Sequence, residues 1–491
     1  MRPGLLDGDT GPEPRPQAES VAADLGLAAV IEAMAGGDPV IAETARVVLL
    51  AMPPSAEHIA YRQQVLTDCV REPGLARELY DLAGRAVEVH ENASRAVFFA
   101  TPETLLNQSI GTLTAFLQLL RELRALAERY RTRVSSAGFQ QFFTMVETQF
   151  GEEYVSSAAA WLGGLGPGGT LLVSARLGAG HQSEALVMRR PHRSARSLFR
   201  RAGRASGPSA TYKIPYGDEA AHRALSSLQD MSLAGLADAV HRSAQHVLAF
   251  FTALRTETAF HLGSLNLRQA LQERGAPVGL PDVRDAESRV LHARGLYDPG
   301  LQLRLDEPVV ANDLDADGKS LIMVTGANRG GKSTFLRSLG LAQLMADAGT
   351  FVGATAFTTS ARSGVFTHFT RDEDDSRTSG KFDEELRRIS QVADGISPYG
   401  LLLCNESFQS TNEREGSGIA RRIVDAMTDA GVTVVFVTHL HELAQGCYED
   451  ALPARFLRAD RDRSFRLHEA APEASSHGAD LWSRRHGLRE D

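Results

Sequence analysis

The segment that decides the fold of this 491-residue chain is Ser320–Thr334, which reads SLIMVTGANRGGKST. An apolar run of strand length leads directly into a Gly-x4-Gly-Lys-Ser pattern that begins at Gly326. In such a strand–loop–helix unit, the backbone N–H groups of the loop bind phosphate oxygens, and the helix dipole beyond it favours anions. The glycines leave space that a Cβ would fill. The spacing therefore predicts a site for the phosphates of ATP.

Two side chains of this pattern have expected roles, and a second motif supplies further candidates. Lys332 is expected to reach the β and γ phosphates, and the hydroxyl of Ser333 to bind Mg²⁺. The apolar run Leu401–Cys404 ends in Asn405-Glu406, where P-loop ATPases have a magnesium-binding acid and then a glutamate that polarises water. Asn405 replaces that acid, so we expect weaker Mg²⁺ dependence or slower hydrolysis. A site that only binds ATP is the open alternative.

The rest of the chain divides into a helical part and an α/β part. Between residues 112 and 150, apolar residues recur at helical spacing, which predicts one long helix or two with a break near Gly138. A second long helix is expected after Asp218. Short apolar runs, Ser320–Thr325, Leu401–Cys404 and Val432–Thr438, fit buried parallel strands. The predicted fold class is multidomain: a long-helix all-α core and lever arm, followed by an α/β P-loop domain of ABC-like type.

Changes of composition predict the domain boundaries. Residues 1–20 are rich in Pro, Gly and acid and are expected to form a disordered leader. The helical core and lever domain is expected over residues 21–300, and the ATPase domain over residues 301–485. Within the helical part, residues 151–215 differ in texture, and two short strands around residues 178–180 predict a hairpin inserted at the tip of the arm.

The expected hairpin is followed by a dense basic cluster. Its seven arginines are Arg189, Arg190, Arg193, Arg196, Arg200, Arg201 and Arg204. Guanidinium groups bind phosphates in pairs, and neutralising several phosphates gives salt-dependent binding that ignores base sequence. We therefore expect these arginines to contact the backbone of duplex or branched DNA. A solvated loop whose charge serves solubility is the open alternative.

The overall composition limits partners and location. The formal net charge is −9, so a contact with nucleic acid must come from a local patch and not from the field of the whole chain. No apolar stretch is long enough to predict a membrane span. Cys69, Cys404 and Cys447 lie far apart, which argues against a disulfide framework or a zinc site and favours the cytoplasm.

Four segments together resemble the ATPase domain of the MutS family of DNA mismatch-repair proteins. They are TGANRGGKSTFLR (residues 325–337), LLLCNESFQSTNEREG (401–416), FVTHLHEL (436–443) and SSHGADL (475–481). The stretch Val309–Asn312 also resembles the family's short segment near the nucleotide base. Over the helical part the likeness is weaker and rests on the layout of long helices and on the start Tyr61–Gln64.

The resemblance implies roles for individual residues. The implied catalytic residues are Glu406 as general base, Lys332, and His439 as a switch that senses the γ-phosphate. The implied nucleotide contacts are Gly326, Asn328, Gly330, Gly331, Lys332, Ser333, Thr334 and Val310, and the implied Mg²⁺ ligands are Ser333 and Asn405. Family members dimerise so that a second subunit completes each ATP site. The matching stretch has Gly380 where the family has serine, so Ser379 or Lys381 is expected to reach across instead.

These features combine into one interpretation, with two alternatives. We expect an ATP-dependent DNA-binding protein of the MutS mismatch-repair type, a homodimeric clamp whose grip on DNA is coupled to ATP binding and hydrolysis. Mg²⁺ is the expected cofactor, and no small-molecule substrate other than ATP is expected. Because the helical core begins within the first 40 residues, we expect a shortened relative without the mismatch-reading domain. An RNA- or ribosome-associated MutS-like ATPase and an ATP-gated scaffold with little hydrolysis are the open alternatives.

Overall fold

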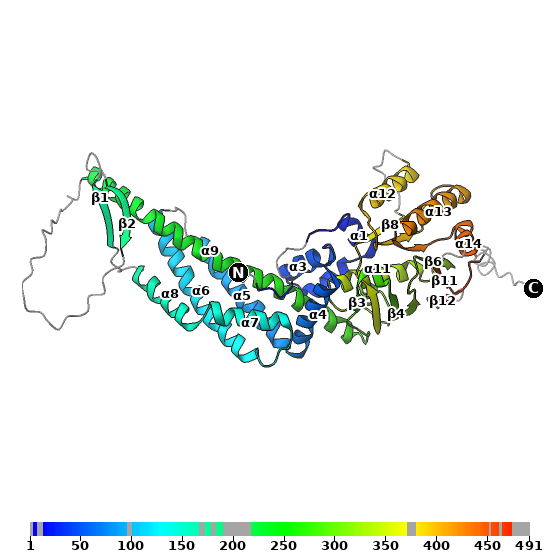
Figure 1. Ribbon diagram of the computed structural model, residues 1–491, viewed down its shortest axis with the longest axis horizontal. Helices are drawn as coiled ribbons and strands as arrows, with labels where there is room; N and C mark the ends of the chain where they lie inside the picture. The colour runs from blue at the N-terminus through cyan, green and yellow to red at the C-terminus, as the bar shows by residue number, and fades with distance from the viewer. Residues whose placement is uncertain are drawn as a thin grey trace, which may run out of the picture. The chain divides into compact units, whose positions relative to one another are not determined.

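The contacts of the chain form two compact units (Figure 1). The computed structural model describes residues 3–6, 13–95, 101–165, 172–177, 183–189, 218–370, 380–450, 453–460 and 464–473. One unit is helical and comprises Met1–Pro3, Glu78–Thr132 and Gln141–Arg255. The other contains the α/β part and comprises Gly4–Arg77, Arg133–Gln140 and Thr256–Asp491. The expected combination of a helical core with an α/β domain is therefore confirmed.

Long helices supply the helical unit. They are α5 (Pro73–Arg95), α6 (Pro102–Tyr130), α7 (Ala137–Gln149), α8 (Glu152–Leu165) and α9 (Glu219–Glu273), of which α5, α7 and α9 also contribute residues to the α/β unit. A capping box between Thr101 and Thr104, with proline at the first helical position, starts α6. The chain leaves the helical conformation between α6 and α7, just before Gly138. Of the two expectations for residues 112–150, two helices with a break is therefore correct.

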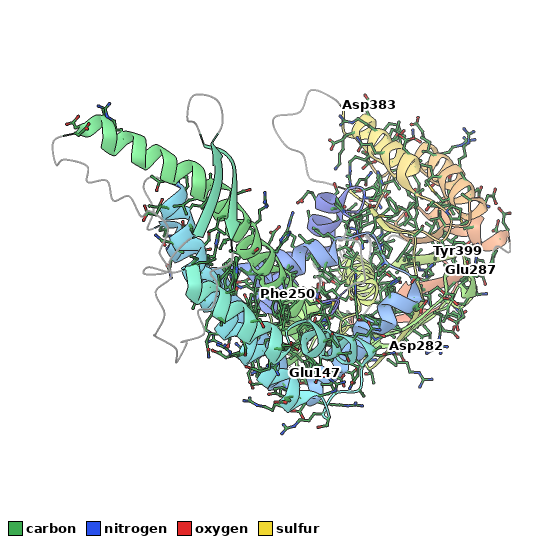
Figure 2. All side chains as sticks on the ribbon, turned by 60° about the vertical axis from the view of Figure 1, so that its left-hand side comes forward. Glu147, Phe250, Asp282, Glu287, Asp383 and Tyr399 are labelled. Atoms are coloured by element: carbon green, nitrogen blue, oxygen red, sulfur yellow. The ribbon has the colours of Figure 1, made fainter. Side chains whose placement is uncertain are left out.

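Aromatic side chains hold the helical unit together. The ring centroids of Phe116 on α6 and Phe251 on α9 are 5.9 Å apart, and those of Phe150 and Phe250 are 5.3 Å apart in an edge-to-face arrangement. Phe250 is labelled in Figure 2. Phe250 and Phe251 are buried, as the apolar stripe of α9 predicts. Among the described residues no helix is both long and apolar enough to cross a bilayer, although α9 has 55 residues.

The predicted hairpin is present. Strands β1 (Leu172–Leu177) and β2 (Ser183–Arg189) pair antiparallel, with Leu172 opposite Arg189 and Leu177 opposite Ser183. Arg189, the first of the seven arginines, is therefore the last residue of β2. The other six, Arg190 to Arg204, lie outside the described residues.

A six-stranded sheet forms the centre of the α/β unit. Its order is β12-β11-β6-β10-β9-β8, and all strands but β12 run parallel to their neighbours. The strand bounds are β6 (Leu321–Gly326), β8 (Val365–Phe369), β9 (Leu401–Asn405), β10 (Thr433–Val437), β11 (Ala454–Ala459) and β12 (Leu467–Glu469). The three parallel strands expected from the apolar runs are thus confirmed as β6, β9 and β10.

Both faces of this sheet are buried, which is why its strands read as continuous apolar runs. Leu321 and Met323 pack on one face against α12 (Lys381–Gly395), α13 (Glu413–Asp429) and α14 (His441–Glu449). Ile322 and Val324 pack on the other face against α11 (Lys332–Asp347). Because successive side chains of β6 point to opposite faces, helices on both faces hold this strand. This packing fixes the position of its carboxyl end.

The N-terminal residues pack in the α/β unit. Helices α1 (Ala18–Leu25), α2 (Ala28–Ala35) and α3 (Pro39–Leu49) join the same core as α11, and α4 (Ala56–Arg71) also belongs to this unit. A Cβ at Gly340 of α11 would lie 2.6 Å from a methyl of Leu25 and 2.7 Å from a methyl of Leu403, so the helix is closely enclosed.

This packing differs from the expected domain layout. Leu5 is fully buried and Arg15 donates to the carbonyl of Ala51 at 2.8 Å, so the described part of the expected leader is ordered. Residues 21–71 lie in the α/β unit and not in the helical one. Their apolar stripes predict helices but do not say which distant surface covers them, which explains the difference.

A smaller sheet, not expected from the sequence, also belongs to this unit. Its order is β3-β7-β4-β5, with the bounds β3 (Asp282–Arg284), β4 (Leu291–Leu296), β5 (Asn312–Asp315) and β7 (Ala356–Ser360). The 3₁₀ turn η2 (Ala286–Ser288) and the short helix α10 (Pro299–Gln302) connect its strands. The edge strand β5 leads into β6. Its first residue, Asn312, contacts the backbone of Phe465 and Leu467.

Stability is expected to depend on pH through His261. This side chain is fully buried, its Nε2 donates to the carbonyl of Leu5 at 2.9 Å, and burial lowers its pKa to about 4. The unfolded chain, whose histidine titrates near 6.5, therefore binds this proton more readily than the folded protein. The stabilisation is complete above pH 6.5 and is lost as the pH falls toward 4, by on the order of 3 kcal/mol.

Thermal unfolding of the wild type and of His261→Gln across pH 4–7 tests this expectation. Glutamine cannot gain a proton in this range, and its amide can still donate to the carbonyl of Leu5. We expect the melting temperature of the variant to fall less steeply below pH 6.5. Asp347, a buried carboxyl with its pKa raised to about 6, acts alike in both proteins and cancels in the comparison. Parallel curves would contradict the assignment.

Candidate functional site

The glycine-rich loop after β6 is shaped by close backbone contacts. Gly326 has φ +111°, and a Cβ there would lie 2.6 Å from the carbonyl oxygen of Ala459 in β11. Gly331 has φ +91° and is the N-cap residue of α11. Arg329, between them, also has a left-handed backbone with φ +61°. The neighbouring strand therefore requires glycine at Gly326, and the loop delivers the chain to the amino end of a long helix.

Lys332 points back toward the loop that precedes it. Its Nζ donates to the carbonyls of Gly326 at 3.1 Å and Ala327 at 2.9 Å, and it lies 3.1 Å from Nε2 of His439. The residue is only 4% exposed, and burial lowers the pKa of its ammonium while the charge of Glu406 raises it. A buried cation with three donors, placed at a helix amino end, favours an anion in this position.

Two groups follow β9 and face the loop. Oδ1 of Asn405 accepts a hydrogen bond from the hydroxyl of Ser333 at 2.9 Å. Oε1 of Glu406 lies 3.5 Å from Nε2 of His439. Contact with His439 lowers the pKa of Glu406, the charge of Lys332 lowers it further, and burial opposes both. Glu406 is therefore a carboxylate at neutral pH and can accept a proton.

His439 lies between the cation and the anion. An ammonium can only donate, so Nε2 accepts when the imidazole bonds to Lys332 and must carry a proton when it donates to Glu406. The imidazole thus has two alternative partners. The hydroxyl of Thr438 accepts from the backbone N–H of Leu440 at 2.9 Å, which shapes the turn that presents His439.

A hollow opens over the loop. It is lined by Asn328, Arg329, Gly330, Gly331, Lys332, Ser333, Thr334, Glu406 and Phe465. The structure therefore brings six of the predicted nucleotide contacts together with the predicted base; Gly326 lines a second hollow instead. Val310 is not among these lining residues, and its contact with the nucleotide stays a prediction.

Apart from Arg329, which lies within the predicted loop, Phe465 is the member of this set that the sequence does not single out. It is 46% exposed and has φ +58°. Its carbonyl accepts from Nδ2 of Asn312 at 3.2 Å, and Oδ1 of Asn312 accepts from the backbone of Leu467 at 2.7 Å. Asn312 thus holds the backbone at Phe465 and two residues after it. The only sequence signal for it is a lone phenylalanine within the polar stretch 460–466.

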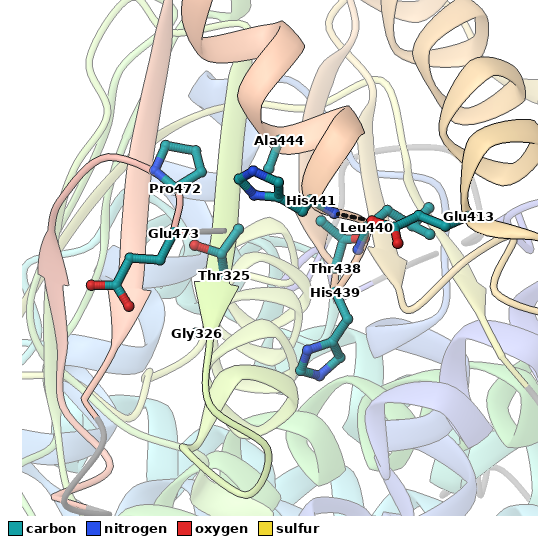
Figure 3. Close-up of a pocket in the computed structure, with 10 residues that line it drawn as sticks. All are labelled: Thr325, Gly326, Glu413, Thr438, His439, Leu440, His441, Ala444, Pro472 and Glu473. Carbon is teal, nitrogen blue, oxygen red and sulfur yellow. Dashed lines mark hydrogen bonds between the residues drawn. The ribbon is translucent and has the colours of Figure 1, made fainter. Parts of the chain in front are cut away.

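A second hollow is lined in part by His439, whose imidazole contacts Lys332 and Glu406 of the first hollow (Figure 3 shows the second hollow). Its lining is Thr325, Gly326, Glu413, Thr438, His439, Leu440, His441, Ala444, Pro472 and Glu473. Glu413 accepts from the backbone N–H of His441 at 3.0 Å, which ties the start of α13 to the start of α14. His439 therefore lines this second hollow and contacts two side chains that line the first.

Other predicted site residues are only partly within the described chain. Lys381 is the first residue of α12, whereas Ser379 lies outside the described residues. The segment 475–481 also lies outside them. In the described part of the chain, no group of three or more His, Cys, Asp or Glu residues is arranged to hold a metal ion. A metal bound here would need ligands other than a protein cage.

Comparisons with known protein families match both parts of the chain. Residues 54–274 match the family model described as the MutS2 N-terminal domain. Residues 322–454 match the model described as MutS domain V. The second match covers the glycine-rich loop, Asn405-Glu406 and Thr438-His439, and the first covers most of the helical unit.

Individual relatives carry the same family name. The chain is 32% identical over 194 residues to the DNA mismatch repair protein MutS of Chloroflexus aurantiacus, covering 38% of this chain and 20% of that protein. It is 30% identical over 151 residues to MutS protein homolog 4 of Mus musculus, covering 31% and 15%. It is 36% identical over 147 residues to the MutS protein of Porphyromonas gingivalis, covering 29% and 16%. The alignments thus span at most about a fifth of these relatives' own length.

Proposed function

The chain belongs to the MutS family, and on that basis we propose that it is a dimeric P-loop ATPase whose grip on DNA is coupled to ATP binding and hydrolysis. One observation carries the ATPase proposal. Three side chains meet at the carboxyl ends of neighbouring parallel strands. Nε2 of His439 lies 3.1 Å from Nζ of Lys332 and 3.5 Å from Oε1 of Glu406. A cation for phosphate, an ionised base and a residue between them are what hydrolysis of a phosphoanhydride requires.

The residues present fit the triphosphate of ATP. A Cβ at Gly330 would lie 2.8 Å from the methyl of Ala459, so the loop passes too close to β11 for a side chain at this position. The amino end of α11 and the ammonium of Lys332 both favour negative charge there. Phe465 offers an exposed ring at the rim of the same hollow, and an aromatic face is suited to stacking on a nucleotide base.

The residues also fit Mg²⁺ held mainly by nucleotide phosphates. Magnesium takes oxygen ligands, and one or two protein groups suffice when phosphates supply the rest. The hydroxyl of Ser333 and the amide oxygen of Asn405 lie 2.9 Å apart and are the two candidates. When bound, the ion would supply positive charge that neutralises phosphate oxygens. Asn405 contributes an oxygen but no charge, so the chain itself attracts the ion only weakly.

The roles of the side chains follow from their charges. Glu406 would accept the proton of the attacking water; contact with His439 lowers its pKa, so the carboxylate is ionised and free to accept at neutral pH. Lys332 would compensate charge on the transferred phosphoryl group. His439 would change partner between Lys332 and Glu406 as the charge near them changes. Each role uses a contact between described residues.

The proposal also includes a contact between two subunits at the ATP site and a contact with DNA. Lys381 or Ser379 would complete the ATP site of a second subunit. The arginines of the cluster Arg189–Arg204 would bind phosphates of a duplex or branched DNA. ATP contacts made by both subunits would favour the closed dimer, which is a shift of population driven by ligand contacts.

Turnover by single-residue variants tests the ATPase. Glu406→Gln keeps the shape of the side chain but cannot accept a proton, so we expect kcat to fall roughly a hundredfold or more with nucleotide affinity retained. Lys332→Ala removes the cation, and we expect affinity for ATP to fall roughly tenfold or more. Unchanged turnover in Glu406→Gln would reject the base. ATP binding by the wild type without turnover would favour the scaffold alternative.

The neutral Asn405 makes a separate prediction for Mg²⁺. Asn405→Asp adds a charged ligand, and interactions with a charged group are stronger by about 1.5 kcal/mol, so half-saturation should need roughly tenfold less Mg²⁺. The measurement is turnover against free Mg²⁺ at saturating ATP. Thermal unfolding of both proteins in EDTA is the control for a general change of stability. Superimposable Mg²⁺ curves would show that Asn405 is not near the ion.

Binding at one fixed salt concentration, with and without ATP, tests the nucleic-acid proposal. The ligands are matched duplex, mismatched duplex, a four-way junction and double-stranded RNA. We expect DNA to bind and ATP to change its affinity. Replacing Arg196, Arg200 and Arg201 with glutamine should lower the slope of log affinity against log salt by about 0.9 per arginine. A clear preference for RNA would favour the RNA-associated alternative, and a monomer with and without ATP would reject the clamp.

A further inference from the structure

The backbone that carries the proposed base is held in an unfavourable conformation. Glu406 has φ +54° and Phe408 has φ +65°, and neither is glycine. Each left-handed residue of this kind costs about 1 kcal/mol or more, so it persists only where surrounding contacts enforce it. The turn from Glu406 to Phe408 is therefore held by its neighbours and not by its own preference.

Glu385 of α12 supplies the contacts to this turn. One carboxylate oxygen, Oε2, accepts from the backbone N–H of Phe408 at 3.1 Å and from the hydroxyl of Ser410 at 2.9 Å. Glu385 is 3% exposed, so these bonds to a carboxylate form away from water and are strong. They fix the backbone two residues after Glu406.

The other oxygen of Glu385 indicates that packing alone does not explain this residue. Oε1 is buried and has no hydrogen-bond partner among the described atoms. A buried carboxylate with one unsatisfied oxygen is costly, and an apolar side chain at the same position of α12 would avoid that cost. The contribution that offsets it is the pair of bonds from Oε2 to the turn.

Two further contacts tie the same turn to its surroundings. The backbone N–H of Thr370, the residue just after β8, donates to the carbonyl of Asn405 at 3.0 Å. The hydroxyl of Thr370 donates to the backbone carbonyl of Glu406 at 2.5 Å. The ring of His368 stacks on that of Phe408 at 5.2 Å, and its Nε2 lies 3.0 Å from the carbonyl of Glu385. The base is thus placed by contacts from β8 and α12 together.

We propose that Glu385 is a positioning residue for Glu406: its carboxylate clamps the turn at Phe408 and Ser410, and the placement of α12 thereby sets the reactivity of the base. The inference rests on the proposed ATPase function. Glu385 does not reach the hollow over the loop, whose lining includes Glu406 but no residue of α12. It acts through the backbone of the turn.

The position of Glu385 in α12 gives this clamp a further consequence. Lys381, the first residue of α12, lies one helical turn before Glu385, about 6 Å along the axis. Residues four apart lie on the same side of a helix. A displacement of the amino end of α12 is therefore transmitted through one rigid turn to the clamp. Any contact made at Lys381 biases the geometry of Glu406.

Steady-state kinetics of three variants tests the clamp. Glu385→Ala removes both bonds, and we expect kcat to fall roughly ten- to a hundredfold while KM and the affinity for ATP change less than about twofold. Glu385→Gln keeps an oxygen that can accept both bonds and should recover most of kcat. Asp383→Ala is the matched control, because Asp383 lies on the exposed side of the same helix and should leave kcat unchanged (Figure 2).

Thermal unfolding separates positioning from folding. If Glu385→Ala does not fold, Ser410→Ala is the second variant: Ser410 is exposed as a residue, and its loss removes only one bond, so we expect kcat to fall by a smaller factor with a smaller change of stability. An unchanged kcat in Glu385→Ala would overturn the inference. So would equal losses in Glu385→Ala and Glu385→Gln, or parallel losses of kcat and ATP affinity.

The two proposals fail in distinguishable ways. If Glu406→Gln abolishes turnover and Glu385→Ala does not alter it, the clamp is rejected and the ATPase stands. If Glu406→Gln and the wild type turn over ATP equally, Glu406 is not the base and the clamp is rejected with it, whereas the ATPase proposal stands without this base; a wild type that binds ATP but does not turn it over rejects the ATPase itself.

Discussion

The parallel register of β6, β10 and β9 is the constraint on which the candidate site depends. Val437 of β10 lies opposite Val324 of β6 on one side and Asn405 of β9 on the other. The glycine-rich loop, Glu406 and His439 therefore emerge at one edge of the sheet. A one-residue shift of β10 would move its end by about 3.3 Å and turn its side chains to the opposite face. Burial of both faces by helices is what prevents such a shift.

The parts of the fold and site that the sequence predicts are those encoded close together in the chain. Continuous apolar runs identify β6, β9 and β10 because both faces of these strands are buried. Each of the three site residues follows a strand by a few positions, so a residue that is close to a strand end in the sequence is also close to it in the structure. These residues are Lys332, Glu406 and His439. The hairpin β1–β2 is similarly local. For these elements, periodicity and turn chemistry are sufficient evidence.

The parts that the sequence does not predict depend on contacts between distant residues. Asn312 holds the backbone at Phe465 across 153 positions, and Asp24 of α1 accepts from Thr367 of β8 across 343. An amphipathic stripe predicts that one face of a helix is buried, but it does not predict which other element buries it. The sequence therefore does not predict that α1–α3 pack against α11. Glu385 is one acid among several at the start of α12, and only the fold shows that it alone accepts from the backbone of Phe408.

The substitution at Asn405 has an electrostatic consequence for the base beside it. An aspartate at this position would add a second negative charge next to Glu406, and like charges raise the pKa of a carboxyl. With an amide there, contact with His439 and the charge of Lys332 both lower the pKa of Glu406. The same amide accepts from Ser333 at 2.9 Å and so retains the hydrogen-bond geometry of the edge. Asn405 therefore attracts Mg²⁺ less strongly than an aspartate would, but it does not raise the pKa of Glu406. Loss of the acid at this position does not by itself mean loss of catalysis.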